Sequence, residues 1–191
     1  SSDELRDVKT IATRSPEGWM LEGGKAFVLH GGSADKFIVS ARIAQDRHTS
    51  EGISLFLVDA RADGVSRRSY ATHDQRNMAD VQFSGVRVAP EALIGPEGGG
   101  LLLLVRAVED GNAALCAEAV GVMDRALEIT VEYLKVRRQF GAAIGSFQAL
   151  RHRAVDMLVR LEQARSMAIY AAASLDETDA ERRALALSAA K

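Results

Sequence analysis

This sequence has little cysteine, no long apolar run and almost no net charge, and each of these features excludes a class of protein or site. The single cysteine, Cys116, cannot form a disulfide within the chain, and it supplies no set of metal ligands. No apolar run approaches the roughly 20 residues that a membrane-spanning helix needs. A net charge of −2 gives no general attraction to nucleic acids or anionic lipids. We therefore expect a cytoplasmic protein with no nucleic-acid partner, no membrane partner and no metal site.

The composition is that of a folded domain. Hydrophobic residues make up 47% of the 191 residues and charged residues 26%, which is enough to build a core. The sequence opens on Ser1, shows no secretion leader, and closes inside an alanine-rich helical pattern without a stop signal. From these ends we expect a piece of a longer protein.

The first half of the chain has the short alternating pattern of strands. Residues 19–22 and 25–29 flank Gly23-Gly24 and predict a hairpin with a two-glycine turn. Further strands are predicted at residues 36–42, 53–58, 65–70 and 79–83, with Gly85 turning the last of them into residues 86–88. Strands this close together predict antiparallel pairing in a sandwich or barrel.

The second half has a helical period. Glycine and proline punctuate residues 90–100, and no proline follows. A first helix is predicted over residues 100–138, and a second from Ser146, a plausible N-cap, with one buried stripe from Phe147 to Ala168. A third helix begins after residue 179. The fold class is thus α+β: a β-domain over residues 1–94, then long antiparallel helices of a truncated up-down bundle over residues 95–191.

The corner between the first two helices gathers groups that suit a ligand. Arg137 and Arg138 stand at a helix end, where they are either charges that complement the helix dipole or donors to an anion. Gln139 and Gln148 add amides, and Phe140 adds a flat face. This combination suits the binding of a ligand that carries a pyrophosphate and an aromatic ring.

His152 and Asp156 follow on the second helix, four residues apart and therefore on one face. An acid–base pair is one interpretation. A structural hydrogen bond or ion pair is the other, and we favour it.

The run R-x-Q-F-G-x-x-I-x-x-F-Q-x-x-x-H-x-x-x-D-M, from Arg137 to Met157, closely resembles the signature of acyl-CoA dehydrogenases. The resemblance covers essentially the whole chain, as the family's middle β-domain and the start of its C-terminal helices. It implies that Arg137, Gln139, Phe140 and Gln148 contact the FAD of a neighbouring subunit.

Residues 24–35 resemble the family's G-x-K-x-W-I-T-N-G-x-x-A segment, whose strand lines the flavin. Here Phe27 replaces the tryptophan, Leu29 the threonine and His30 the asparagine. Phe27 can still stack, whereas Leu29 has no hydroxyl to offer the flavin. His30 either replaces part of that function or caps the strand end. Ser2 resembles the serine that approaches the flavin phosphates.

On the first helix, the resemblance places Val108, Glu109 and Asn112 along the acyl-CoA channel, with Asn112 where the family usually has arginine. From residue type alone, Glu109 is more simply a solvated or interhelical charge. Gly111 stands where a minority branch keeps its catalytic glutamate, and glycine cannot abstract a proton. We therefore assign no catalytic residue to this chain, and we expect the chain by itself to be inactive.

The resemblance implies an FAD-dependent subunit that oxidises an acyl-CoA to the enoyl-CoA in fatty acid β-oxidation. Implied partners are a second acyl-CoA dehydrogenase subunit, in a homo- or heteromeric dimer or tetramer, and an electron-transfer flavoprotein. One alternative is a non-catalytic subunit that shares FAD in a heteromeric enzyme, and another is a related flavin oxidase or monooxygenase. Within the family, residues 28–35 and 114–121 look most like the small-subunit branch of pimeloyl-CoA dehydrogenase.

Overall fold

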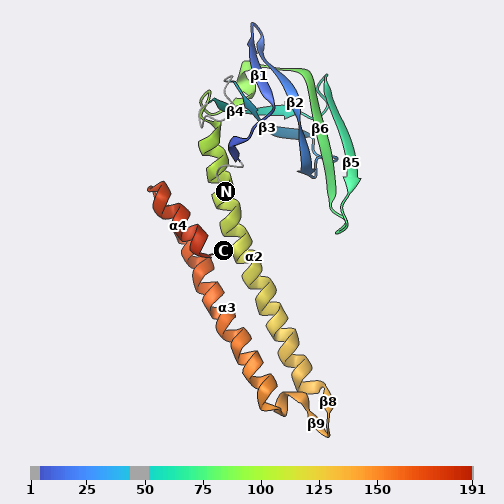
Figure 1. Cartoon of the computed structure of the whole chain (residues 1–191), viewed down its shortest axis with the longest axis vertical. Coiled ribbons are helices and arrows are strands. Elements are labelled where there is room, and N and C mark those ends of the chain that lie inside the picture. Colours follow the sequence, from blue (N-terminus) through green and yellow to red (C-terminus); the bar gives the residue numbers. More distant parts are fainter. Residues whose placement is uncertain (1–4, 44–51, 191) are drawn as a thin grey trace. The chain divides into compact units, whose positions relative to one another are not determined.

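A computed structural model describes residues 5–43 and 52–190 of the chain. The chain divides into two compact units, Ser1–Arg106 and Ala107–Lys191. The first unit holds a seven-stranded sheet in the order β5-β6-β2-β1-β3-β4-β7 (Figure 1). Its strands are β1 (Ile11–Ser15), β2 (Gly18–Leu29), β3 (Lys36–Arg42), β4 (Ile53–Asp59), β5 (Val65–Ala71), β6 (Asn77–Val88) and β7 (Leu93–Ile94), with a 3-10 turn at Pro90–Ala92 before β7.

The pairing is antiparallel throughout except between β1 and β3, which run parallel where Ile11 faces Arg42. Strand β1 lies between β2 and β3 and is antiparallel to β2. Since the chain reverses between β2 and β3 while skipping over β1, β3 must share the direction of β1. The mostly antiparallel β-domain predicted from the sequence is confirmed, and the described parallel contacts are this one and an isolated bridge between Ile53 and Gly99.

The predicted hairpin at Gly23-Gly24 is wrong. Strand β2 runs unbroken through both glycines and pairs with β6 along its length, while the true hairpin joins β1 to β2 through Pro16 and Glu17. Gly23 adopts φ +128 and would place a Cβ 2.9 Å from Thr10 Cα, so the glycine serves a close backbone approach. The predicted turn at Gly85 is likewise a bulge inside continuous β6, where the register shifts between Leu21 and Gly23.

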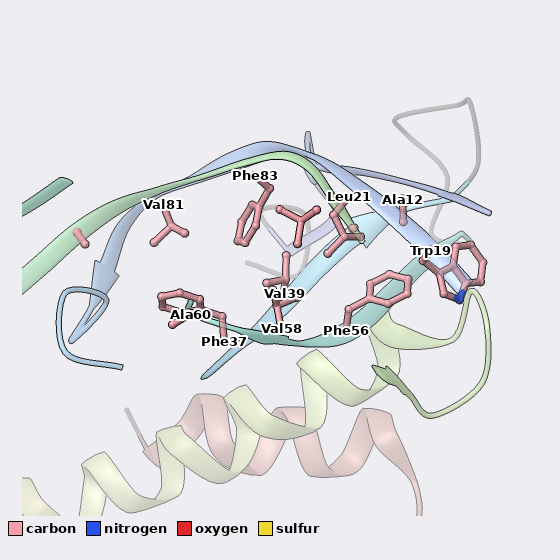
Figure 2. Packing of buried hydrophobic residues seen from close by; sticks show 13 residues of the cluster. Ala12, Trp19, Leu21, Phe37, Val39, Phe56, Val58, Ala60, Val81 and Phe83 are labelled. Carbon is pink, nitrogen blue, oxygen red and sulfur yellow. The ribbon is translucent and has the colours of Figure 1, made fainter. Parts of the chain in front are cut away.

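The core of the β unit lies between two layers of strands (Figure 2). Alternate residues of the strands point inward, and the largest are aromatic: Phe56 and Phe83 are at most 1% exposed, and Trp19 is 5% exposed. Trp19 packs edge-on against Phe56 with ring centroids 5.4 Å apart. A second small cluster joins Val8, Ile53 and Leu101, so the first turns of helix α2 belong to this unit.

The second unit is helical (Figure 1). It holds α2 (Gly100–Val136) from Ala107 onward, the short strands β8 (Arg138–Gln139) and β9 (Ala142–Ala143), a 3-10 turn at Ile144–Ser146, α3 (Gln148–Ser174) and α4 (Ala180–Ala190). Helices α2 and α3 pack through residues spaced three and four apart, among them Val120, Leu161 and Ala168. Among residues 5–43 and 52–190, none of the helices combines the length and apolar character that crossing a bilayer requires.

Two expectations for α3 are corrected. Its N-cap is Phe147 and carries no side-chain cap bond, because Ser146 is held in the preceding turn, where its Oγ donates to the Ala143 carbonyl at 2.7 Å. The predicted buried stripe is buried only in its second half: Leu161 and Ala168 are covered, whereas Leu158 is 47% exposed. In the first half of α3 the stripe residues Leu150, Ala154 and Met157 are only half-buried.

Candidate functional site

The corner from Arg137 to Gln148 is built by a tight hairpin between β8 and β9. Phe140 and Gly141 form its two-residue loop and both have positive φ, +52 and +79. Loops of this length favour such dihedrals because their twist matches that of the strands, although a bulky residue rarely adopts them. The hairpin therefore turns Phe140 outward, and its side chain is 92% exposed.

The two arginines of the corner, equivalent by residue type and told apart only by the family resemblance, differ in the structure. Arg138 bends back over the turn, with Nη2 3.5 Å from the Gly141 carbonyl oxygen. The Arg137 guanidinium makes no side-chain hydrogen bond or ion pair with any residue that the structure describes. Arg137 is therefore the arginine that is available to an anion, and Gln139 and Gln148 of the same corner are also exposed.

Phe140 has one aromatic neighbour, Phe147, at a ring-centroid distance of 6.2 Å and an interplanar angle of 75°. Edge-to-face contact steadies the Phe140 ring while leaving its surface open. Downstream, His152 and Asp156 are both exposed, and within the described chain no hydrogen bond or ion pair joins them. The structural pairing that we favoured for these two residues is thus absent.

In the β unit, Phe27 occupies a bulge of β2. Lys25 pairs with Val81 and Val28 with Ala79, so Ala26 and Phe27 both lie opposite Asp80. Phe27 has φ +55 and is 68% exposed, and its ring meets Tyr70 edge-on at 5.9 Å. These residues line a hollow of about 510 Å³ on the sheet.

Asp80 connects this group. Its Oδ1 accepts hydrogen bonds from the Tyr70 hydroxyl at 3.0 Å and the Phe27 backbone N–H at 3.3 Å, and its Oδ2 accepts one from Arg68 at 2.8 Å. We call Phe27, Tyr70, Asp80 and Arg68 the Phe27 platform. Sequence reasoning missed three of its four members. The available signal was the pairing of β5 with β6, which sets Arg68 opposite Asp80.

The charges of the platform support one another. Hydrogen bonds from Arg68 and then Tyr70 lower the pKa of Asp80 below its usual value. Desolvation, followed by the bond to Asp80, raises the pKa of Tyr70. Asp80 is therefore an anion, and Tyr70 a neutral hydrogen-bond donor, at neutral pH.

The other expected β-domain residues lie at the end of β2. Leu29 is 50% exposed. His30 has φ +56; its N–H donates to the Asn77 carbonyl, and its own carbonyl accepts from the amides of Ser33 and Ala34. The backbone of His30 thus closes the strand end. Ser2 lies outside the described residues.

Arg67 was not anticipated either. Its Nη1 reaches the carbonyl oxygens of Gly31, Gly32 and Ala34, the last at 3.0 Å. It thereby ties the turn that follows His30 to strand β5. The turn contains two glycines, and the position of Gly32 requires one, because a Cβ there would clash with Ser69 and Asn77.

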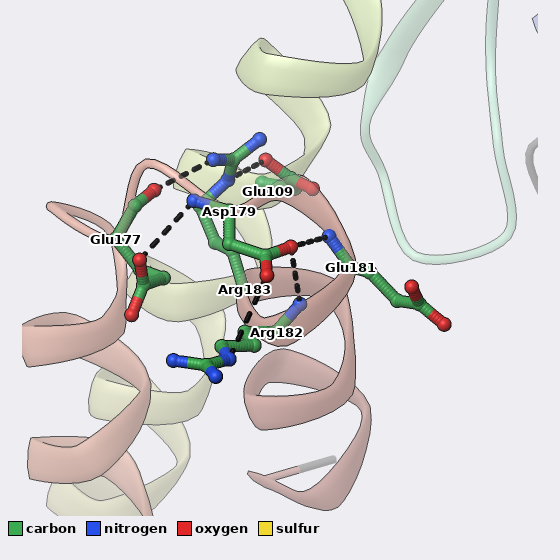
Figure 3. A network of polar contacts seen from close by, with 6 residues as sticks. All are labelled: Glu109, Glu177, Asp179, Glu181, Arg182 and Arg183. Carbon is green, nitrogen blue, oxygen red and sulfur yellow. Dashed lines mark hydrogen bonds and ion pairs between the residues drawn. The ribbon is translucent and has the colours of Figure 1, made fainter.

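Of the expected substrate residues on α2, Val108 is 44% exposed and Asn112 half-buried, whereas Glu109 is buried. The Glu109 carboxylate is bound by Arg183 Nε of α4 at 2.5 Å, and Arg183 Nη1 donates to the Glu177 carbonyl at 2.8 Å (Figure 3). Asp179 caps α4 by accepting the amides of Glu181 and Arg182. Glu109 is thus committed to holding α4 against α2.

Gly111, two residues beyond Glu109, is open on its side-chain face, because a Cβ built there meets nothing within 4 Å. In the part of the chain that the structure describes, no group of three or more His, Cys, Asp or Glu residues is placed to hold a metal ion.

Comparison with known proteins identifies this architecture. The family model "Acyl-CoA dehydrogenase, middle domain" matches residues 1–86, and "Acyl-CoA dehydrogenase, C-terminal domain" matches residues 98–191. The chain belongs to the acyl-CoA dehydrogenase family. Both halves of the chain are therefore accounted for by one family, as the sequence motifs implied.

Three similar proteins illustrate the range of the family. The short-chain-specific acyl-CoA dehydrogenase of Megasphaera elsdenii is 31% identical over 174 residues, covering 88% of this chain and 45% of that protein. The prolyl acyl carrier protein oxidase AnaB has a TM-score of 0.89 at 27% identity, over 98% of this chain and 50% of its own. PigA, solved with FAD and proline, has a TM-score of 0.87 at 30% identity, over 96% and 49%. The chain spans about half the length of the relatives it matches.

Proposed function

We propose that this chain is part of an FAD-dependent acyl-CoA dehydrogenase that removes hydrogen from the α and β carbons of an acyl thioester. The observation that carries the proposal is the corner at Arg137, where a guanidinium without a side-chain partner among the described residues and the exposed ring of Phe140 belong to one short segment. A dinucleotide cofactor offers both matching groups, a pyrophosphate and flat heterocycles. A similar protein, PigA, was solved with FAD.

The residues present fit FAD at two separate surfaces, one in each compact unit. Arg137 would bind phosphate, Gln139 and Gln148 would donate or accept hydrogen bonds, and Phe140 would cover a ring. In the β unit, Phe27 would lie against the flavin. When bound, FAD supplies the acceptor for a hydride, and the α-proton must leave to a base. Gly111 has no side chain to act as that base, and we assign the role to no residue of this chain.

We infer that the corner serves the FAD of a neighbouring subunit, so that a second acyl-CoA dehydrogenase subunit is the first partner. An electron-transfer flavoprotein as the electron acceptor, a place in β-oxidation and a cytoplasmic location complete the proposal. Residues 1–94 and 95–191 remain our proposed domains. Acyl chain length and membership of the pimeloyl-CoA small-subunit branch stay predictions.

A non-catalytic subunit that shares FAD in a heteromeric enzyme is the second candidate. Three observations favour it: Leu29 has no hydroxyl, Gly111 has no side chain, and Glu109 is engaged by Arg183. A flavin oxidase is a third candidate, supported by the likeness to a prolyl carrier-protein oxidase.

The test is bleaching of the bound flavin by a panel of acyl-CoA thioesters, with the enzyme that carries this chain alone and with a candidate second subunit. Bleaching without a second subunit supports the dehydrogenase. Bleaching only in the presence of another subunit supports the shared-FAD candidate, and rapid reoxidation by oxygen supports the oxidase.

A variant locates the cofactor. Arg137→Ala should release FAD without unfolding the protein, as followed by flavin absorbance and circular dichroism. Arg125→Ala is the matched control, because Arg125 is an exposed arginine of α2, the helix that ends just before Arg137, and it pairs with Glu128. Flavin retained by Arg137→Ala at the wild-type level would contradict the assignment.

A further inference from the structure

The backbone of Phe27 is held in a conformation that phenylalanine disfavours. Its φ of +55 belongs to the left-handed region, where a Cβ crowds the backbone, and bulky residues are rare there. Such residues persist only where surrounding contacts fix them. Since the ring is 68% exposed, burial of the side chain is not what holds Phe27 in place.

The contact that does hold it is the carboxylate of Asp80. Two residues of β2, Ala26 and Phe27, bulge opposite this one residue of β6, so the Phe27 amide cannot join the regular ladder. It donates instead to Asp80 Oδ1 at 3.3 Å. Arg68 binds the other oxygen at 2.8 Å and fixes the carboxylate from the neighbouring strand.

The same oxygen also orients the ring of Tyr70. The Tyr70 hydroxyl donates to Asp80 Oδ1 at 3.0 Å, and the two rings then meet at 5.9 Å with an interplanar angle of 80°. Phe27 is thus held through its backbone by Asp80 and through its ring edge by Tyr70. Its remaining surface faces the open hollow.

We propose that Asp80 is a positioning residue: it presets Phe27 in the left-handed bulge so that the ring is ready to receive the flat ring system of the flavin. The proposal rests on the proposed function for its ligand, and it goes beyond it by naming the residue that acts through Phe27. Asp80 itself need not touch the flavin.

The first test needs no flavin. In the chain labelled for NMR, Asp80→Asn should speed hydrogen exchange of the Phe27 amide by about tenfold and weaken the Phe27–Tyr70 ring contacts. Asp74→Asn is the matched control, since Asp74 is a carboxylate beyond the end of β5 that is held by Thr72 and Arg76. Tyr70→Phe removes one hydroxyl and should weaken only the ring contact, leaving the Phe27 amide protected. Unchanged Phe27 exchange in Asp80→Asn would overturn the proposal.

The second test measures FAD affinity in the enzyme that carries this chain. Asp80→Asn should weaken it by about tenfold. In a Phe27→Gly background, Asp80→Asn should add nothing, because glycine adopts positive φ freely and has no ring to place. Equal losses in both backgrounds would overturn positioning through Phe27. If Phe27→Gly alone leaves FAD affinity intact, the flavin contact of the proposed function fails, while the exchange result still decides what Asp80 does.

Discussion

The two compact units of this chain are stabilised in different ways. The β unit buries large side chains completely, with Phe56, Phe83 and Leu21 at most 1% exposed. The described helices after residue 106 bury mainly alanines, together with Val120, Leu161 and Leu187. The free energy gained on burial follows the apolar area removed from water. Most of the stability of the β unit therefore comes from side chains buried inside that unit.

The helical unit instead displays apolar surface. Helix α2 exposes large residues at seven-residue steps, Leu115, Val122, Ile129 and Val136, on a face separate from the one that packs on α3. A stripe with this spacing is the pattern of a helix that packs on a further helix. The corner of Arg137 is therefore carried by helices that leave a regular apolar stripe uncovered among the described residues, and the Phe27 platform by a sheet with a large buried core.

The largest effect is expected from Phe56→Ala, which should destabilise the β unit by about 3–5 kcal/mol through lost burial and the cavity left behind. Trp19, the only tryptophan, contacts Phe56 and reports this transition by fluorescence during urea unfolding. The helical signal in circular dichroism should change little.

Phe140→Ala is the matched truncation in the other unit. Because Phe140 is 92% exposed, its loss should change the free energy of unfolding by less than about 0.5 kcal/mol. Comparable losses for the two phenylalanines would contradict the difference between the units.

The second prediction concerns the buried pair in the helical unit. Arg183→Met leaves the Glu109 carboxylate buried without its cation and should destabilise this unit by about 3 kcal/mol. Thermal unfolding followed by circular dichroism at the helical band measures it, and Trp19 fluorescence should be unaffected.

The double variant Glu109→Gln with Arg183→Met removes both charges and should recover much of that loss. If the double variant is as unstable as Arg183→Met, the cost arises from lost packing of the long arginine side chain. The i,i+3 surface pair Lys135–Glu132 provides a control whose removal should have almost no effect.

The third prediction is a substitution that increases the stability of the β unit. Desolvation lowers the pKa of Lys25 to about 8, and the ammonium donates to Ser40 Oγ at 2.9 Å with no carboxylate among the described residues within ion-pair distance. Lys25→Met should therefore stabilise the protein by about 2 kcal/mol at pH 7.

The sign follows from the direction of the shift. A lysine whose folded pKa lies below its unfolded value makes the folded state less stable wherever the amine must be charged, and this penalty fades as the pH rises from about 8 towards 10.5. The advantage of Lys25→Met should shrink over that range in urea unfolding. A gain that is independent of pH would mean that packing, and not charge, is its cause.

The sequence predicted much of this fold because periodicity is a local property. Helix α2 was expected over residues 100–138 and ends at Val136, and the alternating segments became strands. The hairpin predicted at Gly23-Gly24 was wrong because a pair of glycines suits either a turn or the close approach of another backbone segment, here at Thr10. Which of the two applies is decided by strand order, which no local pattern contains.

The site shows the same limit. Motif spacing singled out Arg137 and Phe140, whereas residue type alone left Arg137 and Arg138 equivalent, since their difference depends on the turn that Arg138 bends over. Asp80 and Tyr70 escaped notice because they meet Phe27 only through the β5–β6–β2 pairing. For Glu109 the sequence offered a channel residue or an interhelical charge, and only the fold brings Arg183, 74 positions away, to its carboxylate.

The smallest predicted effect compares glycines of the two units. Gly111→Ala should stabilise helix α2 by about 0.5–1 kcal/mol, because a helical alanine loses less backbone entropy than glycine and the added Cβ meets no neighbour. Gly121→Ala, equally open on the same helix, is the matched control. Gly23→Ala in the β unit should destabilise instead, since its Cβ would lie 2.9 Å from Thr10 Cα at a positive φ. Thermal unfolding measures all three.

If Gly111→Ala stabilises as Gly121→Ala does but weakens binding of acyl-CoA to the enzyme, the open space at Gly111 belongs to the substrate. If both glycine variants of α2 behave alike in binding, the space is ordinary helix surface that a further packed element covers.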